Sequence, residues 1–408
     1  MITLLASGSG HAEPPPFRIR PIVLMGQPAP GGGRFEHVSV EAQPVLAPVN
    51  RRGQVAFFAT LLRGPAGEGL FVTAGDRIRK VAVDGDPAPG GGTLSGFAKH
   101  PIPSLNDAGT IAFAAAVSGG RTVEGVFVAS GGRLRTIALA GDAAPGVPAG
   151  TLAAVDVPAL NNRGDVAFLA TVRRGRESLE AIYVRAGGRL RKVVVQGEPA
   201  PAGGTFAGFG VPVVSDRGHV AFPAVVEGRA VPGGLFLADG GPLRMLVGAG
   251  EPTPLGGIFA KFSERIALND TGALVFLATL KDAPVASGIF AADGGRVRPV
   301  AALGDPAPGG GVFAHFGLWP TVAADGPIAF TAAVDRSATT VAVFVAAPDG
   351  LRRIVGVGDD LPGVGPLASF GLYPIAAIAA GRVTFATATT ATGEGVEGIF
   401  IAEPGRRP

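Results

Sequence analysis

The sequence contains no cysteine, so disulfide bonds, thiolate nucleophiles and cysteine-ligated zinc are all excluded. Charged residues make up only 16% of the 408 residues, and a net charge of +3 is too small to indicate a nucleic-acid partner. No apolar run approaches the ~18 residues that a transmembrane helix needs. Glycine (65) and proline (36) are too abundant for long helices. The chain is therefore expected to be rich in β-structure and to lack a membrane span.

What the sequence does contain is a seven-fold internal repeat with three landmarks. The first is a glycine that opens a Pro-Ala-Pro type loop: Gly26, Gly85, Gly141, Gly197, Gly250, Gly304 and Gly358. The second is an aromatic residue that closes an apolar run: Phe57, Phe113, Phe168, Phe222, Phe276, Phe330 and Phe385. The third is the aromatic residue of a GIF-like triplet: Phe71, Phe127, Tyr183, Phe236, Phe290, Phe344 and Phe400. Residues of the second set lie 54 to 56 positions apart, which indicates one structural unit repeated in a stack or a ring.

Each unit is predicted to form four short strands. In the second unit these are residues 103–106, 110–117, 125–130 and 133–140, and the turns between them are marked by Asn-Asp-Ala-Gly and Gly-Gly. Four strands in about 54 residues match one blade of a β-propeller. The predicted fold is all-β: a seven-bladed β-propeller of four-stranded antiparallel blades.

The two ends of the chain indicate a closed ring. The last unit stops after its third strand, at residues 398–403, whereas the segment 17–26 resembles the fourth strand of another unit, 188–197. An open solenoid needs dissimilar capping repeats instead. We therefore expect the N-terminal strand to join the last blade, in a single domain that remains a monomer. The expected division is a leader or linker at 1–16, the propeller at 17–403 and a tail at 404–408.

The first sixteen residues favour a location outside the cytoplasm. Residues 1–7 hold an apolar run shorter than the ~7–15 residues of a signal-peptide core. The small-residue and proline-rich stretch at 7–16 is nevertheless typical of the junction that follows a signal peptide. A secreted, periplasmic or cell-surface protein is the expectation.

The turn-and-strand units "LNDAGTIAF" (105–113), "LNNRGDVAF" (160–168) and "LNDTGALVF" (268–276) resemble the NxxGxxAF tandem-repeat proteins of bacteria. The resemblance covers nearly the whole chain, from residue 17 to 402, although the last two units lose the asparagine. It implies a secreted or surface protein. It implies no catalytic group.

Both repeated polar elements are predicted to be structural. An asparagine that opens a turn can bond its own downstream backbone, and the glycine three residues later accepts a positive φ. The aspartates beside these turns suggest calcium, but Ca²⁺ needs ~6–8 oxygen ligands and no EF-hand-like run is present. The acidic residue of each blade-joining loop is likewise assigned to the loop, because no Gly-Lys-Ser/Thr phosphate motif follows it. An acidic ring that binds cations stays the alternative. We expect no metal and no cofactor.

Candidate ligand-binding residues come from a position where the repeats differ, and we call this set the mouth column. Just before the innermost strand, blades 2 to 4 have Ile102, Val157 and Val211, whereas blades 5 to 7 have Arg265, Trp319 and Tyr373. Arginine, tryptophan and tyrosine dominate binding hot spots, and in a propeller this position lies near the mouth of the central channel. Glu264 and His315 are close in sequence and complete the candidate set. The alternative is that the large side chains only plug the channel.

Two classes of function fit this pattern. The first is a non-catalytic binding module, whose polar ligand or partner is a carbohydrate or an anionic polymer at the channel mouth. The second is a propeller enzyme, a hydrolase or lyase of sugars or lactones. An enzyme needs a metal cluster or a paired acid and base in the channel. The histidines share no repeat position, and the best catalytic candidates are His100, His315 and Glu264. Binding is therefore favoured, with no catalytic residue assigned.

Overall fold

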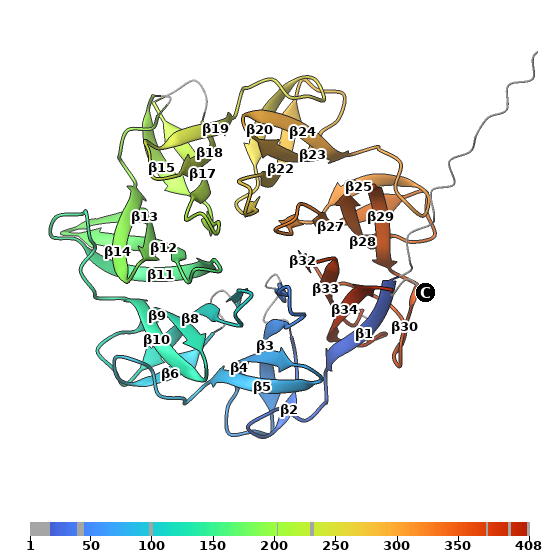
Figure 1. The fold of residues 1–408 in the computed structure, drawn as a ribbon, viewed down its shortest axis with the longest axis horizontal. Coiled ribbons are helices and arrows are strands. Elements are labelled where there is room, and N and C mark those ends of the chain that lie inside the picture. Colours follow the sequence, from blue (N-terminus) through green and yellow to red (C-terminus); the bar gives the residue numbers. More distant parts are fainter. Residues whose placement is uncertain are drawn as a thin grey trace, which may run out of the picture.

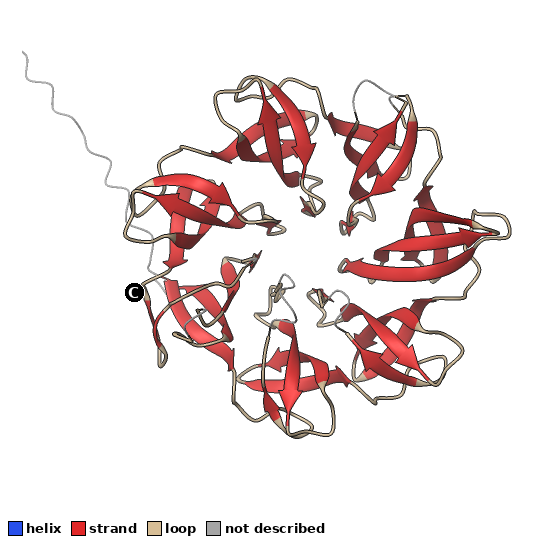
Figure 2. Ribbon diagram, turned by 180° about the vertical axis from the view of Figure 1, so that it is seen from behind, coloured by secondary structure: helices blue, strands red, loops and turns tan. Residues whose placement is uncertain are grey.

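The computed structural model describes residues 17–38, 45–97, 101–201, 203–228, 232–372, 374–390 and 393–405. All regular structure in these ranges is β-strand, and the strands form seven sheets around a central axis (Figures 1 and 2). The described residues include no helix of the length and apolarity that crossing a membrane requires. The predicted seven-bladed all-β propeller is confirmed.

The blades are numbered along the chain. Blade 1 has β2 (Arg34–Phe35), β3 (Ala56–Leu62), β4 (Glu68–Ala74) and β5 (Arg77–Val83). Blade 2 has β6 (Thr93–Gly96), β7 (Ser104–Leu105), β8 (Ile111–Ser118), β9 (Glu124–Ser130) and β10 (Arg133–Leu139). Blade 3 has β11 (Thr151–Leu160), β12 (Val166–Arg174), β13 (Glu177–Ala186) and β14 (Arg189–Val195). Blade 4 has β15 (Thr205–Phe209), β16 (Val213–Val214), β17 (Val220–Glu227), β18 (Gly233–Ala238) and β19 (Arg244–Gly248).

The remaining strands complete the ring. Blade 5 has β20 (Ile258–Phe262), β21 (Ala267–Leu268), β22 (Leu274–Lys281), β23 (Ser287–Asp293) and β24 (Arg296–Ala302). Blade 6 has β25 (Val312–Phe316), β26 (Thr321–Val322), β27 (Ile328–Asp335), β28 (Val341–Ala347) and β29 (Gly350–Gly356). A small two-stranded sheet, β30 (Asp360–Leu361) and β31 (Gly365–Pro366), precedes blade 7. Blade 7 has β32 (Ala376–Ala379), β33 (Arg382–Thr387), β34 (Gly398–Pro404) and β1 (Phe17–Leu24).

The ring closes through the N-terminal strand, as the sequence predicts. β1 pairs antiparallel with β34 from Phe17 opposite Pro404 to Leu24 opposite Gly398, so it supplies the outermost strand of blade 7. Glu403 accepts from Arg20 of β1 at 3.2 Å and from Arg382 of β33 at 3.1 Å. One carboxylate thus links strands from both ends of the chain.

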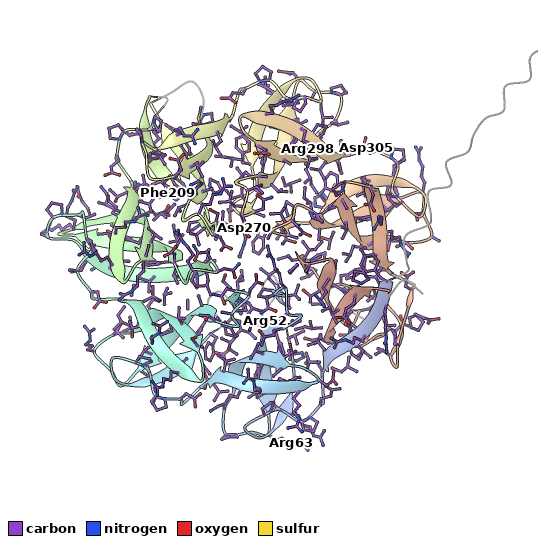
Figure 3. All side chains as sticks on the ribbon, in the orientation of Figure 1. Arg52, Arg63, Phe209, Asp270, Arg298 and Asp305 are labelled. Carbon is purple, nitrogen blue, oxygen red and sulfur yellow. The ribbon has the colours of Figure 1, made fainter. Side chains whose placement is uncertain are left out.

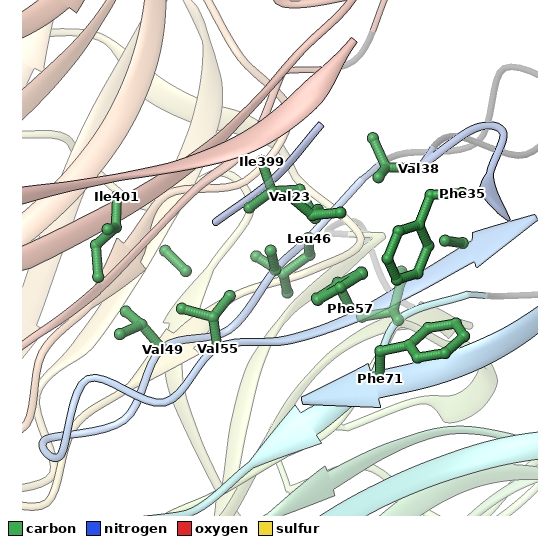
Figure 4. Packing of buried hydrophobic residues seen from close by; sticks show 14 of the residues in the cluster. Val23, Phe35, Val38, Leu46, Val49, Val55, Phe57, Phe71, Ile399 and Ile401 are labelled. Atoms are coloured by element: carbon green, nitrogen blue, oxygen red, sulfur yellow. The ribbon is translucent and has the colours of Figure 1, made fainter. Parts of the chain in front are cut away.

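Apolar packing joins the blades around the ring. Each hydrophobic cluster draws residues from two neighbouring sheets, and the cluster at the seam combines Val23 and Ile399 of blade 7 with Phe35 and Phe57 of blade 1 (Figure 4). The two aromatic landmarks of each repeat face each other across a strand pair. In blade 4, for example, the rings of Phe222 and Phe236 lie 5.9 Å apart, and both are fully buried. The repeated aromatics are therefore core residues.

The innermost strand differs from its prediction. In blade 2 the sequence predicts a single strand at 103–106, but the structure adds β6, from Thr93 to Gly96, which pairs with the outer end of β8. The two pieces are separated by the segment that holds the mouth column. Only in blade 3 is the innermost strand continuous, and β11 there has register shifts between Leu152 and Ala154 and between Asp156 and Ala159. The glycine-rich composition around β6 conceals this piece in the sequence.

The asparagine turns lie at the centre of the ring and make more bonds than the sequence predicts. The Oδ1 atom of Asn106 accepts from the backbone N–H of Ala108 at 3.1 Å and of Thr110 at 2.9 Å, which is the predicted local turn. Its Nδ2 atom also donates to the carbonyl of Asn161 in the next blade, at 3.1 Å. Asn50 and Asn161 bridge to their next blades in the same way. Each of these asparagines therefore forms its own turn and fastens it to the next blade.

Candidate functional site

The acidic residues of the blade-joining loops accept hydrogen bonds from the backbone at the end of the preceding strand. Asp86 accepts from the backbone N–H of Val83 at 3.0 Å, and Asp305 accepts from that of Ala302 at 2.8 Å. Asp142, Glu198 and Asp359 repeat this bond to the residue three positions earlier. These bonds agree with the structural role that the sequence predicts for this acidic position.

A ring of polar side chains surrounds the axis beside the asparagine turns. It consists of Arg51, Asp107, Asn162, Asp216 and Asp270, and we call it the axial ring; it lines a cavity of about 190 Å³, and Asp270 lies near the centre of the propeller in Figure 3. Each of the first three donates its backbone N–H to the next side chain, at 2.7 to 2.8 Å. Burial and the neighbouring Asp216 raise the pKa of Asp270. Among the described residues, no three His, Asp or Glu side chains are grouped so as to hold a metal ion.

A cavity of about 980 Å³ opens among blades 3, 4 and 5, and Ile102 of blade 2 and Leu318 and Trp319 of blade 6 also line it. We call it the mouth cavity. Three aromatic side chains line it, Phe209, Phe262 and Trp319, and none of them is fully buried. Ile102, Val157 and Val211 of the mouth column also line it. Four residues of the mouth column, Ile102, Val157, Val211 and Trp319, therefore border one cavity.

The position of this cavity follows from a missing side chain in blade 4. In four blades, a glutamate just before the third landmark accepts a backbone N–H from the next blade at 2.7 to 2.9 Å; these bonds join Glu397 to Val38, Glu68 to Phe97, Glu124 to Val155 and Glu180 to Phe209. Blade 4 has Gly233 at this position. Gly208 and Gly210 of the same blade also line the cavity and have no side chains that could fill it. Without a glutamate at this position, the space between blades 4 and 5 is left open, and Gly233 and Phe262 line it there.

Charged groups are distributed unevenly around the mouth cavity. Blade 3 contributes Asp156 and Glu180, and blade 5 contributes Lys261 and Glu264. Asp156 is only 8% exposed, and its Oδ1 accepts the N–H of Val157 at 2.8 Å. Glu264 and Lys261 are exposed. The cavity therefore offers several hydrogen-bonding groups between its aromatic surfaces.

Val157 has a strained backbone at the edge of the cavity. Its φ is 39°, a value that a β-branched residue rarely adopts, and Pro158 follows it. Strained residues of this kind persist only where the surrounding structure holds them, and they are concentrated at binding and active sites. The bond from Val157 N–H to Asp156 fixes the strained segment against the cavity.

The structure brings together some of the candidate residues named from the sequence. Trp319 and Glu264 line the mouth cavity, and the guanidinium carbon of Arg265 lies 5.1 Å from the centre of the Trp319 ring. Trp319 also packs against the seam cluster, so part of its side chain contributes to the packing of the ring. His315 is exposed on β25, opposite Ala333, and does not line the cavity. Tyr373 and His100 lie outside the described residues.

Sequence analysis missed Phe209 and Phe262 as cavity residues. Their equivalents Phe97 and Phe316 are 2% and 3% exposed, so the repeat alignment marks this aromatic position as core. The glutamate position is interrupted in blades 4, 5 and 6, by Gly233, Ser287 and Val341, and among these only Gly233 has no side chain, which is the signal in the sequence for the cavity.

A third cavity, of about 320 Å³, is lined by an unusual carboxyl group, Asp84. Its Oδ1 atom is buried and has no hydrogen-bond partner among the described residues. Burial, and then the nearby charge of Glu68, raise the pKa of Asp84 to about 6. Other blades have uncharged residues at this position, such as Ala140 and Leu303.

We expect the variant Asp84→Asn to become more stable than the unchanged protein as the pH rises. Because the pKa of Asp84 is higher in the folded chain, the folded state binds the proton more tightly, and this contribution to stability is lost between about pH 4 and pH 6. Thermal unfolding from pH 4 to pH 8 should give similar melting temperatures at pH 4 and a higher one for Asp84→Asn above pH 6. Parallel curves for the two proteins would contradict this assignment.

No curated protein matches the sequence, whereas several solved structures are similar in fold. A puromycin-hydrolyzing peptidase of Mycobacterium tuberculosis has a TM-score of 0.49 and 14% identity over 91% of this chain, and this chain spans 56% of its length. Polysaccharide lyase Uly1 has a TM-score of 0.45 and 9% identity over 93% of this chain and 94% of that one. The Dos1 propeller has a TM-score of 0.43 and 9% identity, with 95% of both chains covered.

At such low identities these similarities concern the fold alone. The resemblance to NxxGxxAF repeat proteins stays an expectation. One family model matches residues 18–287 and again residues 176–403, and the two overlapping matches together extend over all seven blades. The chain therefore belongs to DUF7453, a family of unknown function.

Proposed function

We propose that this protein is a non-catalytic binding module located outside the cytoplasm, and that it binds a carbohydrate in the mouth cavity. The observation that carries the proposal is the lining of this cavity, in which the rings of Trp319, Phe209 and Phe262 alternate with polar side chains. The location is proposed from the resemblance to secreted repeat proteins, and cell fractionation of the source organism tests it.

A carbohydrate suits this lining for two reasons. The faces of aromatic rings pack against the apolar C–H faces of sugar rings, whereas carboxylates and lysine form charge-assisted hydrogen bonds with hydroxyl groups. A volume of about 980 Å³ is at the upper end of small-molecule sites and accommodates an oligosaccharide.

Tryptophan fluorescence tests the proposal directly, because Trp319 is the only tryptophan in the chain. A panel of neutral and acidic oligosaccharides should include one that shifts the emission in a saturable way and protects Trp319 from iodide quenching. A panel without any saturable shift, together with an absence of binding by calorimetry, would contradict the proposal.

We expect the variant Gly208→His to abolish this binding without unfolding the protein. His315 occupies the equivalent bulge position in blade 6, so a histidine fits this backbone. A Cβ atom at Gly208 meets only the carboxylate end of Glu180, at 3.3 Å, and the ring then projects into the mouth cavity. The affinity should fall at least about tenfold, which is about 1.4 kcal/mol. His315→Ala is the matched control and should bind like the unchanged protein.

The alternative is an enzyme that cleaves a sugar in the same cavity. It is favoured by the carboxylates Asp156, Glu180 and Glu264, since glycoside hydrolysis requires a pair of carboxyl groups. Incubation with each oligosaccharide that binds, followed by mass spectrometry, distinguishes the two functions. New fragments that disappear with Glu264→Gln would establish the enzyme, whereas unchanged oligosaccharides support the binding module.

A further inference from the structure

Arg265 is the one cation of the mouth column, and its charge is not neutralised. The residue is partly buried, and its Nη1 atom is buried without a hydrogen-bond partner among the described residues. No carboxylate of the described chain forms an ion pair with it, although other arginines such as Arg20 and Arg382 are paired. Its side chain packs on the face of Trp319, and the centre of that ring lies 5.1 Å from the guanidinium carbon.

Such an arginine costs stability in the ligand-free protein. A buried donor without an acceptor loses its hydration and gains nothing in exchange, and the loss is larger for a charged group. Burial lowers the pKa of Arg265 to about 10, which shows the same penalty on the charged form. The contact with the Trp319 ring offsets only part of this loss. At neutral pH the side chain is still charged, so an anion from outside the chain would supply the missing partner.

The position of Arg265 connects it to the mouth cavity. Glu264, the preceding residue, and Trp319, on whose ring it packs, both line the cavity, while Arg265 itself does not. The guanidinium therefore lies behind the wall that the Trp319 ring helps to form. Val211, another lining residue, is held to Arg265 by a parallel β-bridge between blades 4 and 5. For the guanidinium to reach a ligand in the cavity, the ring of Trp319 has to turn aside.

The charges around the cavity give a ligand one orientation. Asp156 and Glu180 place only carboxylates on the blade 3 side, and both already accept backbone N–H groups there. The blade 5 side has the cations Lys261 and Arg265 against the single carboxylate Glu264. An acidic group therefore fits only at the blade 5 side, where Arg265 can offer two parallel N–H donors to it.

We propose that Arg265 binds the carboxylate of an acidic sugar, such as a uronic acid, within an oligosaccharide held in the mouth cavity. The inference rests on the proposed function and specifies its ligand class. It makes Arg265 the residue that selects acidic over neutral sugars, and Trp319 the ring that covers the guanidinium until the ligand enters.

Calorimetry with matched ligands tests the inference. Oligogalacturonate and sialyllactose are each compared with their methyl esters, because the two members of each pair differ only in the charge of their carboxyl groups. The unchanged protein should bind at least one acidic member tenfold or more tightly than its neutral partner. Arg265→Met should remove this preference and leave the affinity for the neutral partner unchanged. Arg265→Lys should retain part of it, and Arg298→Met, on the outermost strand of the same blade, should retain all of it.

The outcomes separate this inference from the proposed function. If no oligosaccharide of any charge binds, the proposed function fails and the inference with it. If acidic and neutral partners bind equally, or if Arg265→Met weakens both equally, the inference fails and the binding module stands. Unliganded Arg265→Met should melt at or above the temperature of the unchanged protein, because it loses an unpaired buried charge. A clearly lower melting temperature would show instead that Arg265 is a packing residue.

Discussion

Removal of residues 17–25 is expected to unfold the propeller at temperatures where the full chain is stable. The deletion removes β1, whose backbone pairs with β34 along its whole length, and it removes Val23 from the seam cluster, where Val23 is fully buried. It also leaves Glu403 without Arg20. A strand's hydrogen bonds at about 1 kcal/mol each, together with its buried apolar side chains, give a loss of roughly 5 kcal/mol or more. Calorimetry or circular dichroism measures the change.

The exposed edge of β34 gives this experiment a second readout. An unpaired strand edge is a template for pairing with another strand, so the truncated protein should associate or aggregate. A synthetic peptide of residues 17–25 should restore the melting temperature by adding the missing strand. Deletion of residues 1–12, which precede β1 in the sequence, is the matched control and should leave the melting temperature unchanged. Equal melting temperatures for both truncations would contradict the closure of the ring by β1.

The architecture could be predicted from the sequence because similar turn and strand motifs recur in every repeat. The glycine after each asparagine turn needs a positive φ, and the structure shows it, for example 79° at Gly109 and 98° at Gly272. Seven aligned copies also reveal the incomplete last unit, and this incompleteness predicts the seam. Repetition turns weak local signals into a strong one, since an accidental pattern does not recur at 54 to 56 residues.

The site could be predicted only in part, because a cavity depends on side chains that are absent. The mouth column identified Trp319 and Arg265 as exceptional, and they do lie in contact. Gly233 of blade 4 lines the cavity where four blades have a glutamate, and its position beside Phe262 of blade 5 exists only after folding. The innermost strand pieces before the mouth column were missed for a related reason: their pairing with the second strand of each blade compensates for a low strand propensity.

The asparagine turns provide the second large expected effect, since their side chains join the blades at the axis. We expect Asn106→Ala to lower the free energy of unfolding by about 3–5 kcal/mol, because two buried hydrogen bonds and one partly buried one are lost, and the backbone groups of Asn161 and Thr110 stay buried. Asn106→Asp keeps the oxygen that accepts from the turn but loses the donor to Asn161. It should lower the free energy of unfolding by less than Asn106→Ala only if the hydrogen bonds within the turn contribute more than the bond between the blades.

Blade 4 provides the matched control for this experiment. Ser215 occupies the asparagine position there, and its Oγ is buried with no hydrogen-bond partner among the described residues. Ser215→Ala should therefore be neutral or slightly stabilising, although it truncates the same turn position and is equally buried. Denaturant unfolding of the three variants measures the differences. If Asn106→Ala were as mild as Ser215→Ala, the backbone alone would hold the turns, and the side-chain bonds between the blades would contribute nothing to the stability of the ring.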